Sequence, residues 1–246
     1  MNNKDEVSRR SRGYEERIVA FVDILGFSSL VEKSNTDQRV YEQIKHALDT
    51  IQEIKKRSDG TNTKAATFSD SIVLSYSITA EKPLLNALKN LVELQFELLR
   101  QGILVRGGVA KGTVRHVQEM VFGPAMVAAY ELESKYAVYP RIIIEKELID
   151  WETQNYHAVA NNGIDYGIDL NSIVRKDGYT NVFYIDTFKY IADTSYAKSN
   201  SLYESIKTLI IEGLDNKNKA VRMKYAWLKN YFEEATNQII GYQEQL

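Results

Sequence analysis

Two aspartates stand where the sequence predicts that strands end. Asp23 follows Ile18–Val22, a short apolar run rich in β-branched residues that is typical of a strand buried on both faces. Asp70 lies between two strand-like runs, within Ser69-Asp70-Ser71, whose side chains favour a tight turn. From a strand end and a hairpin tip, two carboxylates can bind a hard cation such as Mg²⁺. The spacing alone leaves open whether the two residues meet.

The residues after Asp23 suit a phosphate group. Gly26 has no side chain, and the apolar periodicity predicts a helix that begins just after it. Backbone N–H groups at a helix start bind anions. We therefore expect a metal and a triphosphate to share this corner. The structural alternatives are that Asp23 caps the helix and that Asp70 only shapes its turn.

Apolar residues at helical spacing predict the helices. Two helices are expected between Gly26 and Ser58, divided near Asn35, and others begin at Pro83 and after Gly123-Pro124, the last running to about Val138. Two more are expected from Ser199 onward.

Short apolar runs between these helices predict the strands. We expect strands at 18–22, 65–68, 72–76, 103–110, 113–117 and 141–144. A turn at Lys111-Gly112 is expected to join the strands at 103–110 and 113–117. Residues 151–181 are expected to be irregular, and 181–185 to form a late edge strand. This order of elements predicts an α+β fold in which helices pack on one face of a mostly antiparallel sheet.

The amino-acid composition limits which partners the protein can bind and which cellular compartment suits it. The 246 residues include Lys+Arg 31 and Asp+Glu 33, a net charge of −2, so no overall basic field favours nucleic acid. The absence of cysteine excludes disulfides and thiolate metal sites and fits a reducing compartment. The sequence has neither a run of roughly 18–20 apolar residues nor a signal-peptide pattern. We expect a cytoplasmic protein that binds neither nucleic acid nor membrane.

The residues around Asp23 also resemble a known family. The run Phe21-Val22-Asp23-Ile24-Leu25-Gly26-Phe27-Ser28 resembles the signature that opens class III nucleotidyl cyclase domains. The hairpin at Asp70 is similar in place to that family's second metal-binding aspartate. Val105–Gly112 resembles its glycine-containing strand pair, and Val121–Val127 its later aromatic-glycine segment. The resemblance covers about residues 17–145, continues more weakly to about 186, and implies the ferredoxin-like, or palm, form of the α+β fold.

The resemblance implies roles for residues of this chain. Two divalent ions, Mg²⁺ or Mn²⁺, are expected at each site, held by Asp23, Asp70 and the backbone carbonyl of Ile24. Leu25, Gly26 and Phe27 are expected to contact the substrate. The cations expected near the phosphates are Arg106, Lys111, Arg115 and Lys176. Arg106 and Lys176 are counted with the two aspartates as catalytic. The alternatives are a structural ion pair for Arg106 and solvated surface charges for Lys111 and Arg115.

The same resemblance implies an assembly and a division of the chain. Class III sites lie between two subunits, so we expect a homodimer with two equivalent sites. Residues 1–15 are expected to be a flexible tail and 16–190 the cyclase catalytic domain. Residues 191–246 are expected to form a helical extension that packs on the domain or dimerises.

The sequence departs from the family where purine cyclases select their base. Ala66 and Met120 occupy the positions of the base-selecting lysine and acidic residue. Val127 and Glu131 occupy those of the asparagine and arginine that steady the transition state, and Thr113 that of a triphosphate-binding arginine. Either the site is inactive or it accepts another base, and the retained aspartates favour the second interpretation.

The segment Gly123–Glu133, with its Gly-Pro-Ala start and Ala-Tyr-Glu-Leu-Glu end, resembles the pyrimidine cyclases of bacterial Pycsar antiphage systems. That resemblance implies conversion of UTP or CTP, with UTP favoured, to cyclic UMP or cyclic CMP, and a separate effector that senses the product. The base pocket is expected to include Ala66, Phe68, Met120, Phe122 and Tyr130, for which core packing is the alternative. A purine cyclase with unusual base contacts and a catalytically silent nucleotide-binding module remain the competing hypotheses.

Overall fold

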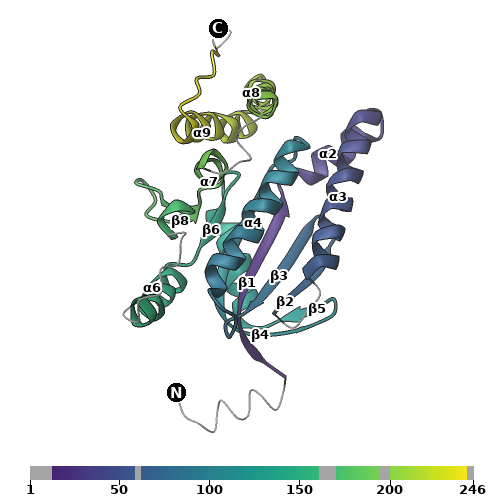
Figure 1. Cartoon of the computed structure of the whole chain (residues 1–246). Coiled ribbons are helices and arrows are strands. Elements are labelled where there is room, and N and C mark those ends of the chain that lie inside the picture. The colour runs from purple at the N-terminus through teal and green to yellow at the C-terminus, as the bar shows by residue number, and fades with distance from the viewer. Residues whose placement is uncertain (1–12, 59–61, 161–169, 194–199, 243–246) are drawn as a thin grey trace.

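A computed structural model of the chain describes residues 13–58, 62–160, 170–193 and 200–242 (Figure 1). Within these residues, one sheet runs in the order β2-β3-β1-β4-β6-β8-β7, with β5 paired to β4. The strands are β1 (Glu15–Ile24), β2 (Thr63–Phe68), β3 (Ser71–Ser77), β4 (Val105–Val117), β5 (Met120–Phe122), β6 (Ile142–Ile144), β7 (Val174–Lys176) and β8 (Phe183–Ile185).

The helices precede, follow and cover these strands. They are α2 (Phe27–Ser34), α3 (Gln38–Ser58), α4 (Pro83–Arg100), α5 (Pro124–Glu131), the π-helix η1 (Leu132–Tyr136), α6 (Lys146–Ala160), the 3₁₀ turn η2 (Leu170–Ser172), α7 (Thr187–Asp193), α8 (Asn200–Leu214) and α9 (Lys219–Thr236). No helix in the described part of the chain is both long and apolar enough to cross a membrane.

The apolar strand β1 lies inside the sheet and pairs antiparallel with both β3 and β4. Among the described pairings only β4 with β6 is parallel. The expected α+β fold with a mostly antiparallel sheet is therefore confirmed. The hairpin expected around Asp70 and the two helices divided near Asn35 are also present, as β2–β3 and as α2 and α3.

The two faces of β1 are buried against different helices. Ile18, Ala20 and Val22 belong to the main core cluster, which α3 and α4 cover on one face of the sheet (Figure 1). Val19 points the other way, into a smaller cluster with Ala125 and Ala129 of α5. Helices therefore pack on both faces of the sheet, with α5 on the face opposite to the one where helices are expected.

The contact between α5 and the sheet depends on Gly108. A Cβ atom at this position would lie 2.2 Å from the carbonyl oxygen of Ala129 and 2.6 Å from Cβ of Leu132. No side chain can occupy that space, so a glycine here lets the α5–η1 segment approach β4.

Three local expectations were wrong. Lys111 and Gly112 form no turn, because both residues are paired with β1 and β4 continues to Val117 before turning at Gln118 into β5. Residues 151–160, expected to be irregular, belong to α6, while 161–169 lie outside the described residues. The strand expected at the sheet edge, β8, lies between β6 and β7, because the three-residue β7 forms the edge.

The helix expected to run to about Val138 is divided. α5 ends at Glu131, and the chain continues through the π-helical turn η1 to Tyr136.

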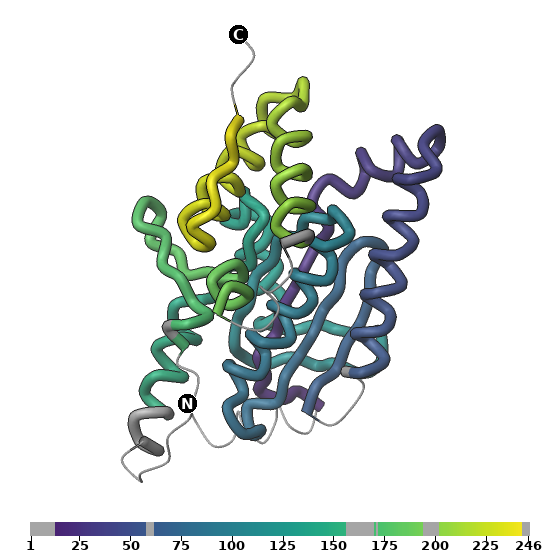
Figure 2. Tube along the Cα trace, turned by 45° about the horizontal axis from the view of Figure 1, so that its top comes forward, coloured from purple at the N-terminus to yellow at the C-terminus, as the bar shows by residue number. Residues whose placement is uncertain are grey.

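The C-terminal helices form a second core with the end of the sheet. Figure 2 shows α8 and α9, coloured yellow-green to yellow, packed together at one end of the molecule. Leu228 and Phe232 of α9 share a cluster with Leu104, Tyr184 and Phe188. The last two helices thus pack on β8, α7 and the start of β4.

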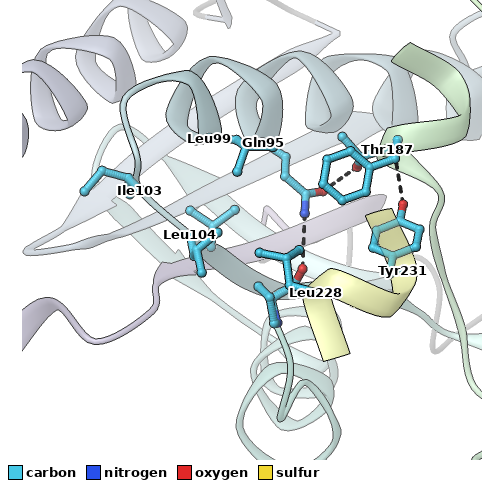
Figure 3. Close-up of a pocket in the computed structure, with 10 residues that line it drawn as sticks. Gln95, Leu99, Ile103, Leu104, Thr187, Leu228 and Tyr231 are labelled. Atoms are coloured by element: carbon cyan, nitrogen blue, oxygen red, sulfur yellow. Dashed lines mark hydrogen bonds between the residues drawn. The ribbon is translucent and has the colours of Figure 1, made fainter. Parts of the chain in front are cut away.

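A polar network crosses this second core around a cavity of about 10 Å³ (Figure 3). The hydroxyl of Tyr231 donates to the Asp186 carboxylate at 2.9 Å and accepts from the Phe188 N–H at 3.1 Å. The Thr187 hydroxyl donates to the Gln95 side-chain oxygen at 2.7 Å. α9, α7 and α4 are therefore joined by hydrogen bonds inside an apolar environment.

Tyr231→Phe is expected to destabilise the fold by about 2 kcal/mol, because the variant leaves the Asp186 carboxylate and the Phe188 N–H without the hydroxyl. Urea denaturation followed by circular dichroism measures the change. Tyr41→Phe, at a half-exposed ring on α3, is the control and should change stability by less than about 0.5 kcal/mol. Equal stability of the two variants would contradict the role given to the Tyr231 hydroxyl.

Glu152 of α6 is a buried carboxyl, 1% exposed. Burial raises its pKa to about 7, and a backbone hydrogen bond from Leu84 offsets only part of this effect. In the unfolded chain the group loses its proton near the ordinary value of 4.5. Between these two values the folded state holds the proton and the unfolded state does not, so stability falls as the pH rises.

Glu152→Gln is expected to remove that dependence and to stabilise the protein by roughly 3 kcal/mol above pH 7, with little effect at pH 4.5. Thermal unfolding across pH 4.5–8 measures the difference between variant and wild type. Glu147→Gln, an exposed position of the same helix, is the matched control. If the difference in stability between Glu152→Gln and wild type does not change with pH, the raised pKa of Glu152 is ruled out.

Candidate active site

Asp23 lies at the end of β1, directly opposite Ser71 on β3 and Arg106 on β4. Residues opposite one another in a sheet point to the same face, so the three side chains converge. The Ser71 hydroxyl donates to the Asp23 Oδ1 atom at 2.9 Å, and Arg106 Nη2 lies 3.5 Å from Oδ2. Burial raises the pKa of Asp23, and the Ser71 hydrogen bond opposes the rise.

Asp70 lies at the tip of the β2–β3 hairpin beside Asp23. The Ile24 N–H donates to the Asp70 carbonyl oxygen at 3.3 Å, which ties the hairpin tip to the residue after Asp23. The negative charge of Asp70 contributes to the raised pKa of Asp23 after the larger effect of burial. The structure therefore brings together the two carboxylates that the sequence singled out.

Gly26 sits at the helix start expected after Asp23. Its φ of 78° is left-handed, it is the N-cap of α2, and a Cβ there would meet nothing within 4 Å. Leu25 is fixed by its N–H, which donates to the Leu104 carbonyl oxygen at 2.8 Å, and Phe27 begins the helix. Because no side chain caps α2, the alternative role of Asp23 as a helix cap does not apply.

Glu133 also belongs to this cluster, although no sequence motif predicts a role for it. It comes from η1, is 3% exposed, and its Oε1 atom lies 2.7 Å from Arg106 Nε. Burial raises the pKa of Glu133, opposed by the Arg106 charge and reinforced by Asp23 and Asp70. A π-helical turn brings Glu133 to the sheet, and the sequence does not reveal that turn. The one sequence signal for Glu133 is its place at the end of the segment Gly123–Glu133.

Three of the expected cations lie elsewhere in the chain. Lys111 points to the opposite face, where its ammonium pairs with Glu16 at 3.2 Å and lies 5.1 Å from the Trp151 ring. Arg115 lies opposite Phe122 at the far end of β4. Lys176 is exposed on β7, four strands from β1, which is about 19 Å at ordinary strand spacing. Of the four expected cations, Arg106 is the one that the structure brings to Asp23.

The residues expected around the base are divided between surface and core. Phe68 is 43% exposed and opposite Ser71, in the same row as Asp23. Tyr130 is half-exposed and packs edge-on against Phe21 at 5.5 Å. These two rings lie beside the aspartates and are accessible.

The other three expected pocket residues belong to or lie beneath the β4–β5 hairpin. Met120 and Phe122 are exposed on β5, and Phe122 packs edge-on against Tyr14 at 5.7 Å. The hairpin tip docks on β2, where Glu119 accepts a hydrogen bond from the Thr67 N–H at 3.1 Å. Ala66, next to Thr67, is fully buried and offers no surface to a ligand.

The donor set at the corner fits magnesium or manganese. Asp23 and Asp70 offer hard carboxylate oxygens, and no group of three or more metal-binding side chains exists in the described part of the chain. Mg²⁺ is usually bound by one or two carboxylates together with substrate phosphates and water, so two aspartates are a sufficient protein contribution. The contribution of the Ile24 carbonyl stays a prediction.

Comparisons with known proteins find distant similarity to solved structures. No family model matches the chain, and no curated protein matches it. Among solved structures, the guanylyl cyclase Cya2 matches at 13% identity and a TM-score of 0.43, over 70% of this chain and 91% of that one. The adenylyl cyclase CyaB from P. aeruginosa matches at 17% identity and 0.44, over 70% and 94%. A bacterial light-regulated adenylyl cyclase matches at 16% and 0.43, over 80% and 98%. Function therefore has to follow from the side chains of the site.

Arg106→Gln is expected to destabilise the protein by about 2 kcal/mol, because Asp23 and Glu133 then lack their shared cation. The value lies below the usual loss of roughly 3–5 kcal/mol for a broken buried pair, since Arg106 is 29% exposed. Urea denaturation at pH 7 measures it.

The double variant Arg106→Gln/Glu133→Gln tests the cause of that loss. It removes the buried carboxylate as well as the cation, so it should recover at least half of the lost stability. Arg39→Gln, at a side chain 93% exposed, is the surface control. Failure of the second substitution to relieve the first would show that the two residues do not share an ion pair.

Proposed function

We propose that the chain is a nucleotidyl cyclase that converts a pyrimidine nucleoside triphosphate to the 3′,5′-cyclic monophosphate and pyrophosphate. The observation that carries the proposal is the meeting of Asp23 and Asp70 beside the left-handed Gly26 at the start of α2. A metal-binding pair next to exposed backbone N–H groups suits a metal-bound triphosphate. The cyclase-like residues Phe21–Ser28 add the reaction class.

In this reaction the ribose 3′-oxygen attacks the α-phosphorus in line. A bond forms between that oxygen and phosphorus, the bond from phosphorus to the bridging oxygen of pyrophosphate breaks, and the hydroxyl proton passes to solvent. When bound, two divalent ions lower the pKa of the 3′-hydroxyl and neutralise charge on the triphosphate. The chain's own part is to hold Asp23 and Asp70 as ligands and to position the phosphates.

Arg106 supplies positive charge to the same corner. Its guanidinium lies between Asp23 and Glu133, so the side chain is oriented before substrate arrives. A fixed cation stabilises phosphate charge at little reorganisation cost, which is how such groups act in phosphoryl transfer. The open backbone at Gly26 gives phosphate oxygens a second place to bind.

The preference for a pyrimidine rests on the residue types at the positions that the cyclase resemblance assigns to base recognition. Ala66 and Met120 supply neither the cation nor the carboxylate that would read a purine edge, while Phe68 and Tyr130 present exposed rings beside the aspartates. We favour UTP over CTP, and cyclic UMP as a second messenger that a separate effector senses in antiphage defence. That role follows from the resemblance of Gly123–Glu133 to the Pycsar cyclases.

A homodimer is part of the proposal. Lys111, Arg115 and Lys176 do not approach Asp23 within one chain, so any contact they make with substrate needs a second copy. Exposed apolar side chains that suit such an interface occur on β4, β5, α5 and η1; they are Val117, Met120, Phe122, Val127, Tyr130 and Tyr136. Residues 16–190 are the proposed catalytic domain and 191–246 its extension.

A catalytically silent nucleotide-binding module is the second candidate. Val127 is 57% exposed, and Glu131 pairs with Lys135 at 2.7 Å, so neither offers the amide or the cation expected at its position. Such a module would bind a triphosphate at Asp23 and Asp70 without turning it over.

The full-length protein incubated with ATP, GTP, CTP or UTP and Mg²⁺ or Mn²⁺ is expected to form a cyclic pyrimidine nucleotide, detected by mass spectrometry. Asp23→Asn and Asp70→Asn should each lower the rate at least about 10²-fold, because the metal loses a ligand. Asp49→Asn, an exposed aspartate of α3, is the matched control.

Each other outcome selects a competing function. A cyclic purine product would reject the assignment of the base while keeping the reaction. Binding of triphosphate without any product would identify the silent module.

A further inference from the structure

Lys224 of α9 is a partly buried lysine whose charge interacts with that of Arg106. Burial lowers the pKa of Lys224, and the positive charge of Arg106 lowers it further. Within the described part of the chain, Lys224 has no ion-pair partner. A cation that is partly desolvated and lies beside a like charge costs free energy unless an anion joins the two.

The packing of α9 explains why Lys224 reaches this place. Leu228, one turn later on the same face of the helix, lines a small cavity with Leu104 and Val105, the residues that lead into Arg106 (Figure 3). Trp227, three residues after Lys224, stacks on Tyr139 at 5.1 Å, just before β6. The first anchor holds this face of α9 against the start of β4, where Arg106 is paired with Asp23, and the second holds it against the residues before β6, the strand next to β4.

The charges at the corner match an anionic ligand bound through metal. Asp23 and Asp70 are assigned to divalent ions, and Glu133 is paired with Arg106. Lys224 is left as a cation with no assigned partner among the described residues. A phosphate group placed between Lys224 and Arg106 would give both cations an anion, and such charge-assisted contacts are the strong ones.

We infer that Lys224 belongs to the substrate site and binds a phosphate group of the triphosphate together with Arg106. The C-terminal extension then contributes a side chain to the site as well as packing on the domain. The inference rests on the proposed cyclase function for its substrate. The chemistry that it requires, a polyphosphate anion beside two cations, can be tested without turnover.

Lys224→Gln, Lys224→Arg and wild type are to be compared with the substrate and with inorganic tripolyphosphate as the probe. Lys224→Gln should raise KM for the triphosphate about tenfold or more, and should weaken tripolyphosphate binding measured by calorimetry by a similar factor. Lys224→Arg keeps the charge and should stay within about threefold of wild type. Lys219→Gln, an exposed lysine in the first turn of α9, is the matched control and should match wild type.

The unfolding temperature separates a binding role from a structural one. Because Lys224 lies beside a like charge, Lys224→Gln should leave the unfolding temperature unchanged or raised. Unchanged KM and unchanged tripolyphosphate binding in an active protein would overturn the inference and leave the cyclase function standing. A fall in unfolding temperature that Lys224→Arg restores, without an effect on either ligand, would also overturn it.

Failure of the cyclase function gives a different pattern. The wild-type protein would then form no cyclic nucleotide, yet tripolyphosphate binding that Lys224→Gln weakens would still support the anion site. Loss of that binding difference in an inactive protein would reject both.

Discussion

The Arg106 guanidinium lies between the carboxylates of Asp23 and Glu133, and the arrangement of the whole corner depends on that contact. Asp23 is the second-last residue of β1, Arg106 is the second residue of the neighbouring strand β4, and Glu133 comes from a π-helical turn on the same face of the sheet. Two carboxylates that burial disfavours are held together because one cation serves both. Any ligand of Asp23 therefore acts on a group whose charge is already partly balanced.

Strand register decides which face of the sheet Asp23 and Arg106 occupy. Helix packing decides how closely Glu133 approaches that face. A slip of one residue in β1 would turn Asp23 to the opposite face, towards α3 and α4. The buried residues on both faces, such as Ile18 on one side and Val19 on the other, oppose such a slip. Gly108 then sets how closely the α5–η1 segment, and with it Glu133, approaches the strands. The site is thus positioned by the register of β1 and by the packing of the α5–η1 segment on β4.

The sequence was informative where a signal is local. Asp23 and Asp70 were found because a strand end and a turn each have short signatures, and Gly26 because a helix start follows it. Glu133 and Lys224 were not found, because a π-turn and the docking of a helix almost 120 residues after Arg106 place them. The pattern around Lys111-Gly112 predicted a turn, but pairing with β1 overrode that preference. The turn would bring Lys111 to the phosphates, whereas the continuous strand β4 places its side chain on the opposite face from Asp23.

The second core can be completed only late in synthesis of the protein, because α9 is near the end of the chain. Leu104, Tyr184 and Phe188 are all made before the helix that covers them, since α9 begins only at Lys219. Until that helix leaves the ribosome, these apolar side chains and the carboxylate of Asp186 face water or a chaperone. The central sheet can pair earlier, because β1 to β4 are complete by Val117. The strands that carry the two aspartates are thus synthesised well before the helix that packs beside their corner.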